Sequence, residues 1–156
     1  MANVEVKKDY SAEALLRKEK EVELDTDDVK AQDIELNQTI VVTVEYKGKP
    51  PVAENPPWSG GFTWTKSQDG YPWIGVSCQA NGSYLWYPSK EHPSDEPEGA
   101  DIHITVTKPL SVASNGVLQK VTDLKNKWHT WHWKTNYNIN PYNINFTVGN
   151  FKAWYL

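Results

Sequence analysis

The chain has 156 residues, 38% of them hydrophobic, and a formal net charge of −4 at pH 7. This length suits one domain that buries roughly 70% of the surface exposed by its unfolded chain. The negative charge, with no separate basic cluster, argues against nucleic acid or an anionic membrane as a partner. No apolar run could span a bilayer, and the first residues lack the apolar core of a signal peptide, so the compartment stays open.

Residues 1–38 are dense in charge of both signs and leave two interpretations open. Ser11 could cap a short helix over residues 11–21. In contrast, Val22 and Leu24 alternate with acidic residues, which is typical of a strand. We therefore expect an ambiguous charged segment over residues 1–38, followed by a β domain over residues 39–156.

The rest of the chain alternates between strand and turn signals. Residues 39–46 are rich in β-branched side chains and predict a strand, and four prolines between residues 50 and 57 then predict an extended, irregular crossing. Three dipeptides predict turns: Asp69-Gly70, Asn81-Gly82 and Asn115-Gly116. Further strands are predicted over residues 101–107, 128–135 and 143–148.

Closely spaced strands with Gly, Asn and Pro turns indicate an all-β sandwich or open sheet. We expect an open, saddle-like arrangement of mixed and antiparallel sheets, with at most a short helix near the N-terminus. The single cysteine, Cys78, excludes an internal disulfide. Because Cys78 alternates with Ile74 and Val76, we expect it on an apolar strand face.

No metal site is predicted from the four histidines. His129 and His132 are an odd number of residues apart, so on a strand their side chains point to opposite faces and cannot share an ion. His92 and His103 show no Cys, His or carboxylate at a spacing that would make a zinc site. Asp95 and Glu96 are adjacent acids in a proline-bounded loop, where solvation or backbone capping is a better explanation than paired catalysis.

The eight tryptophans and eight tyrosines allow two interpretations. An exposed aromatic row could stack against carbohydrate or contact a peptide. Four tryptophans in alternating strands are better explained as core residues: Trp64, Trp73, Trp131 and Trp133. Trp58, Trp86 and Tyr87 lie near predicted loops and are left undecided.

Several motifs, in this order, resemble the amino-terminal domain of the aminopeptidase N and leukotriene-hydrolase type of zinc metallopeptidase, in its bacterial branch. The resemblance runs from about residue 40 to 151. Its motifs are YKGKPP at 46–51, NPPWSGGF at 55–62, PWIGVSCQ at 72–79, Trp-x-Pro-x-Lys at 86–90, SDEP at 94–97, VASNG at 112–116 and NINPYNINFTVG at 138–149.

The resemblance implies a non-catalytic domain that scaffolds a zinc-bearing catalytic domain and binds the substrate's amino terminus with it. The Gly-x-Met-Glu-Asn loop and the zinc-binding helix of that family are absent from these residues, so the chain alone should be inactive and should hold no zinc of its own. The alternative is a stand-alone aromatic-rich module that binds carbohydrate or peptide.

The resemblance also implies one substrate-binding residue, Gln79, which follows Cys78 at the end of a predicted strand. In that family the Gln or Glu at this place helps to hold the free α-amino group of the substrate, and a carboxamide oxygen can accept from an ammonium group. A capping role at the sheet edge is the alternative. We further expect an exposed docking face around Phe151, Trp154 and Tyr155, for the catalytic domain or for a second copy of the chain.

Overall fold

Two four-stranded antiparallel sheets make up the fold, which confirms the all-β prediction. The computed structural model describes residues 2–5, 42–78, 83–89, 92, 94 and 96–153. Sheet A has the order β1 (Ala2–Glu5), β4 (Ala100–Thr107), β7 (Trp128–Thr135), β6 (Val117–Asp123). Sheet B has the order β2 (Gly61–Lys66), β3 (Pro72–Ser77), β8 (Phe146–Gly149), β5 (Ser111–Ser114).

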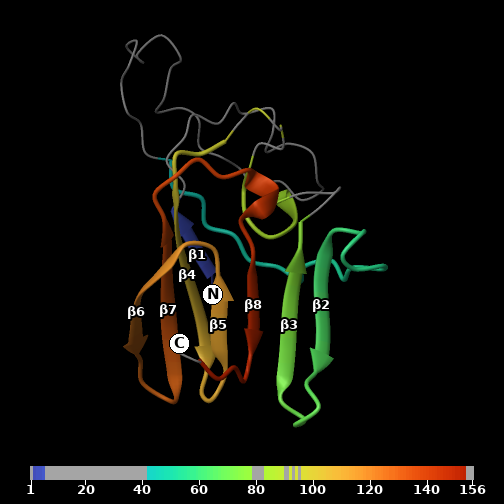
Figure 1. The fold of residues 1–156 in the computed structure, drawn as a ribbon, viewed down its shortest axis with the longest axis vertical. Coiled ribbons are helices and arrows are strands. Elements are labelled where there is room, and N and C mark those ends of the chain that lie inside the picture. The colour runs from blue at the N-terminus through green and yellow to red at the C-terminus, as the bar shows by residue number, and fades with distance from the viewer. Residues whose placement is uncertain are drawn as a thin grey trace.

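The two sheets lie side by side in the view of Figure 1, with β6 and β2 at opposite ends and β5 beside β4 in the middle. Every strand pairing within the two sheets is antiparallel, so neither sheet is mixed. The parallel pairing among the described residues is one isolated bridge between Val52 and Phe62. The helical elements of the described residues are two short 3-10 turns, η3 (Ser83–Leu85) and η4 (Pro141–Asn143). The described residues contain no helix with the length and apolar character needed to cross a bilayer.

The core lies where the inner faces of the sheets meet. On β4, Ile102 and Ile104 alternate with half-buried polar residues, and on sheet B the buried strand residues are Phe62, Val112, Phe146 and Val148. This alternation has period two, so one face of each strand packs inward while the other faces outward. Cys78 belongs to the same buried cluster, which confirms its predicted place on an apolar strand face.

Side chains of β7 join the two sheets. The His129 ring nitrogen Nε2 lies 2.6 Å from the carbonyl oxygen of Leu110, and the Trp133 indole nitrogen donates to the carbonyl of Val112 at 3.1 Å. Both acceptors lie at or next to β5, an edge strand of sheet B. These contacts use backbone groups that an edge strand would otherwise leave unpaired.

The hairpin predicted at Asp69-Gly70 joins β2 to β3 in continuous register, which confirms that turn. Asn115-Gly116 is also a turn, but it carries the chain from β5 in sheet B to β6 in sheet A rather than closing a hairpin. The Asn81-Gly82 turn lies outside the described residues. The six residues after it, 83–88, begin with η3 rather than a strand.

The strand predicted over residues 39–46 is wrong for its described part. Residues 42–46 have no strand structure and are mostly exposed. β-branched side chains favour a strand only where a partner strand and a packed face exist, and these residues have neither. Of residues 1–38, the structure describes Ala2–Glu5, which pair with β4; the predicted short helix and the strand around Val22 lie outside the described residues.

Candidate functional site

The predicted substrate-binding residue, Gln79, follows the end of β3. Ile74 and Val76 pack against the core and Cys78 is buried, so the even-numbered residues face inward, as predicted. The pairing of β3 with β8 covers Ile74 and Gly75 only, so the last residues of β3 continue without β8 beside them. Gln79 itself lies outside the described residues, and its role therefore stays a prediction.

The aromatic side chains divide differently from the prediction. Trp131 and Trp133 pack against the core, as expected. Trp64 was predicted to fill the core, but its side chain is 54% exposed and stacks on Phe62 at a ring distance of 5.6 Å. Its position explains the error: Trp64 lies on the same side of β2 as the buried Phe62, but β2 is an edge strand of sheet B and its last three residues are exposed.

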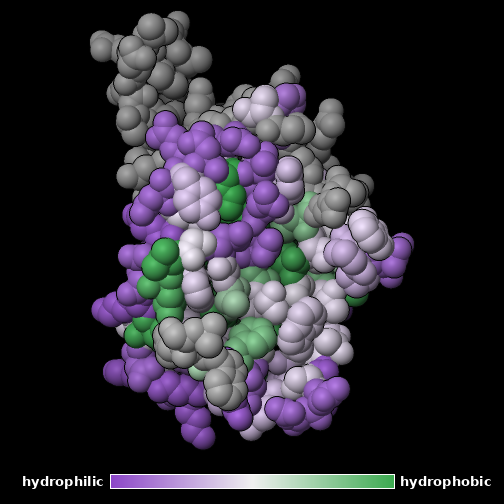
Figure 2. Space-filling view, in the orientation of Figure 1, coloured by the Kyte–Doolittle hydropathy of each residue, from purple (hydrophilic) through white to green (hydrophobic). Residues whose placement is uncertain are grey.

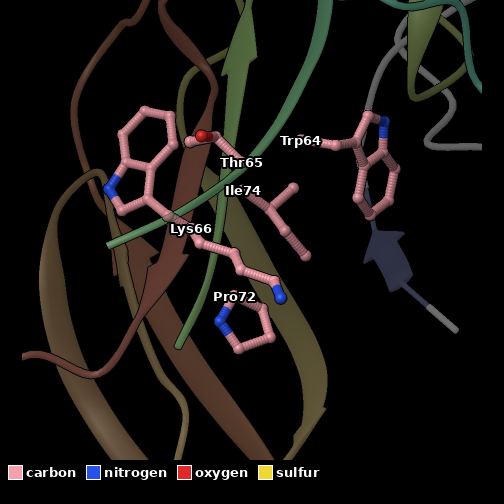
Figure 3. Close-up of a pocket in the computed structure, with 6 residues that line it drawn as sticks. Trp64, Thr65, Lys66, Pro72 and Ile74 are labelled. Atoms are coloured by element: carbon pink, nitrogen blue, oxygen red, sulfur yellow. The ribbon is translucent and has the colours of Figure 1, made fainter. Parts of the chain in front are cut away.

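An open hollow of about 540 Å³ lies on the β2–β3 hairpin, lined by Trp64, Thr65, Lys66, Pro72, Trp73 and Ile74. Figure 3 shows Trp64 and Ile74 projecting to the same side of the hairpin, with Thr65 on the opposite side. Trp73, also predicted to fill the core, lies outside the core cluster because it faces away from Ile74 and Val76 on β3. It is half-buried over Gly75, where a Cβ atom would lie 2.8 Å from the indole, so the glycine permits this close packing. The hollow offers apolar aromatic faces and one cation.

The two undecided tryptophans have opposite environments. Trp58 is 68% exposed, whereas Trp86 is only 6% exposed and packs edge-on against Tyr87 and Phe146. Tyr87 is also buried, and its hydroxyl donates to the carbonyl of Pro141 at 2.9 Å. Trp86 and Tyr87 are therefore core residues, whereas Trp58 and Trp64 are the most exposed tryptophans of the described residues.

Polar side chains gather on the outer face of sheet A, between β4 and β7. His103 is paired directly opposite His132, and Asp101 directly opposite Lys134. The imidazole rings of His103 and His132 stack with centroids 4.0 Å apart and an angle of 16° between their planes. One carboxylate oxygen of Asp101, Oδ1, lies 2.6 Å from Nε2 of His132, and the other, Oδ2, lies 3.1 Å from Nζ of Lys134.

The prediction that His129 and His132 point to opposite faces is confirmed, since His129 faces inward toward Leu110 and His132 outward toward Asp101. The prediction that His103 has no histidine or carboxylate at ligand spacing is wrong. Potential ligand atoms of Asp101, His103 and His132 all lie within 4.8 Å of one another. Asp101 and His103, two residues apart on one strand, were the missed signal, because this spacing places both side chains on one face.

The other candidate acids and histidines do not join this group. His92 is exposed and its Nδ1 lies 2.7 Å from the hydroxyl of Ser94. Glu96 is half-buried in the loop before β4, and Asp95 lies outside the described residues.

Asp101 has a pKa below its usual value. Partial burial alone would raise the pKa of this carboxyl, but hydrogen bonds from His132 and Lys134, together with their positive charges, lower the pKa by more. A carboxyl with a lowered folded-state pKa stabilises the fold above its unfolded-state pKa, and this stabilisation is lost as the pH falls through the folded-state value.

We therefore expect the wild-type protein to be more stable than Asp101→Asn at about pH 6, and this advantage to shrink as the pH falls toward about 2. Urea unfolding of both proteins in the presence of a chelator measures the difference. An advantage that stays constant or grows over this range would contradict the assigned direction of the pKa shift.

A comparison with known protein families, curated proteins and solved structures finds no match for this chain.

Proposed function

We propose that the chain is the non-catalytic amino-terminal domain of a zinc aminopeptidase of the aminopeptidase N type. In this proposal it scaffolds the catalytic domain and forms part of the wall that receives the amino terminus of a peptide substrate. The observation that carries the proposal is the ordered set of motifs between residues 46 and 149.

Contacts between the motifs support the proposal. The Trp86 indole nitrogen donates to the carbonyl of Ile144 at 3.2 Å, and the backbone N–H of Asn145 donates to the side-chain oxygen of Asn115 at 2.9 Å. Ser114 donates to the carbonyl of Asn145 at 2.6 Å. These bonds connect three motifs that are far apart in the sequence, so the motifs specify one packed arrangement rather than independent turns.

Exposed apolar side chains suit a domain that packs against another. All of β6 is exposed at the edge of sheet A, and its apolar side chains Val117, Leu118 and Val121 face solvent. They form the apolar strip over β6 at the left of Figure 2. Phe151 is 41% exposed, in keeping with the predicted docking face, whereas Trp154 and Tyr155 lie outside the described residues. Such surface is typical of an interface between domains.

Gln79 is the residue to which we assign a direct role in the substrate site. Its side-chain oxygen would accept a hydrogen bond from the substrate's ammonium group, while the zinc that supplies the hydrolytic chemistry is held by the catalytic domain. Hydrogen bonds to charged groups contribute about 1.5 to 3 kcal/mol, which corresponds to about tenfold or more in an equilibrium or rate constant.

The test is the kinetics of Gln79→Ala in the polypeptide that carries both domains. We expect kcat/KM for an unblocked peptide to fall about tenfold or more, with the zinc content unchanged. Gln68→Ala, in the exposed β2–β3 turn, is the matched control and should leave kcat/KM unchanged. An unaltered kcat/KM in Gln79→Ala, or chelator-sensitive peptide hydrolysis by the 156-residue chain alone, would contradict the proposal.

The alternative function is a stand-alone module that binds carbohydrate or peptide through aromatic side chains. The exposure of Trp58 and Trp64 and the hollow beside Trp64 favour it. A glycan array separates the two functions: robust binding that is lost in Trp64→Ala supports the module, whereas the proposed scaffold domain should show no such binding.

A further inference from the structure

We propose that Asp101, His103 and His132 form a binding site for one divalent transition-metal ion on the outer face of sheet A. These residues lie on β4 and β7, and the site is independent of the aminopeptidase proposal and of Gln79. Two imidazoles and one carboxylate would bind the ion, and solvent would occupy the remaining coordination positions.

The geometry brings the three ligands together on a fixed support. β4 and β7 pair in unbroken register over their whole length, which sets the backbone positions of all three residues. Ligand atoms around a tetrahedral zinc ion with bonds of 2.0–2.2 Å lie roughly 3.3 Å apart. The potential ligand atoms here are within 4.8 Å of one another, so side-chain rotations alone can close the site.

Partial exposure makes this closure feasible. The His132 and Asp101 side chains are 27% and 32% exposed, so neither is locked by core packing. The stacked imidazoles must tilt out of their nearly parallel arrangement for their nitrogens to converge on one ion. This movement takes place on the partly exposed outer face of sheet A.

The hydrogen bond between Asp101 and His132 marks where an ion would enter. Its proton lies between Oδ1 and Nε2, the two atoms that would become ligands, and metal binding would release a proton bound there. Lys134 bonds the other carboxylate oxygen, Oδ2, so an ion could replace the proton at Oδ1 without breaking the bond to Lys134. A ligating carboxylate that is itself hydrogen-bonded to an outer partner is the usual arrangement in protein metal sites.

The donor set defines the class of ion. Imidazole suits Zn²⁺, Cu²⁺, Ni²⁺ and Fe²⁺, whereas Mg²⁺ and Ca²⁺ prefer oxygen ligands only. A partly exposed cross-strand ion pair contributes about 0 to 1 kcal/mol, so ion pairing alone gives little reason for two histidines to be placed at this carboxylate. Zinc is the probe of choice because it takes three protein ligands and a water.

Titration with Zn²⁺ against a chromophoric chelator tests the proposal on the 156-residue chain. We expect one equivalent to bind and to raise Tm, since an ion that binds only the folded state stabilises it. The variants His103→Gln, His132→Gln and Asp101→Asn should each weaken binding about tenfold or more. His92→Gln, which changes an exposed histidine outside the cluster, is the matched control and should bind as the wild type does.

Nuclear magnetic resonance of the imidazole nitrogens tests the site in the wild-type protein, so this measurement does not depend on whether a variant folds. In the wild-type protein, Zn²⁺ should shift the ring signals of His103 and His132 and leave those of His92 and His129 unchanged. Shifts confined to His92 or His129, affinity unchanged in folded His132→Gln, or no binding up to about millimolar Zn²⁺ would overturn the proposal.

Discussion

Trp86→Ala should lower the free energy of unfolding by about 3 to 5 kcal/mol, because it removes a large aromatic side chain from the core and leaves a cavity. Trp86 contacts Tyr87 and Phe146 edge-on, and its indole nitrogen donates to the carbonyl of Ile144. The substitution would also remove this hydrogen bond and leave the weaker Cys78 thiol, at 3.7 Å, as a side-chain donor to that carbonyl, which adds to the cost. Urea unfolding monitored by circular dichroism measures the change.

Trp58→Ala is the control for this prediction. Trp58 is the same residue type in a neighbouring motif but is mostly exposed, so its replacement should change stability by no more than about 0.5 kcal/mol. Equal effects of the two substitutions would contradict the burial of Trp86 and with it the packing of residues 83–89 against residues 141–146.

Gly116→Ala should be the second large effect. Gly116 has a φ of +84°, and a Cβ atom there would lie 2.0 Å from the carbonyl oxygen of Lys134. The backbone conformation alone costs a non-glycine residue about 1 to 3 kcal/mol, and the contact with β7 backbone adds to that because it cannot be relieved by a side-chain rotation. Thermal unfolding should show a lowered Tm.

Gly48→Ala is the matched control, since no heavy atom beyond Gly48 and its two chain neighbours lies within 4 Å of the position that its Cβ would take. We expect its Tm to stay close to that of the wild type. A Gly116→Ala protein as stable as Gly48→Ala would show that the turn between β5 and β6 does not pass so close to β7.

Local sequence signals were sufficient where neighbouring strands are also neighbours in the sequence. The Asp69-Gly70 turn with strands on both sides predicted the β2–β3 hairpin, and the alternation over residues 101–107 predicted the buried and exposed faces of β4. In both cases turn chemistry and period-two patterning act within a few residues.

The sequence did not show which sheet each strand joins. Asn115-Gly116 has the composition of a hairpin turn, yet β5 pairs with β8 and β6 pairs with β7. Residues 42–46 have strand composition without a strand partner. Pairing depends on which inner faces can be buried together, and this is decided by residues far apart in the chain.

The polar cluster was missed for a related reason. Asp101 and His103 are two residues apart, but His132 lies on another strand, and only the register of β4 with β7 brings it opposite His103. Trp64 was misassigned because alternation predicts the face of a side chain but not whether the core reaches it at the edge of the sheet.

The coding sequence beyond codon 156 in the native transcript tests the proposed function most directly. We predict an uninterrupted reading frame that encodes a Gly-x-Met-Glu-Asn loop followed by His-Glu-x-x-His on a helix, the pattern that places two zinc ligands and a general base on one face. A stop codon directly after Leu156, or a continuation without these motifs, would contradict an aminopeptidase domain and favour the aromatic binding module.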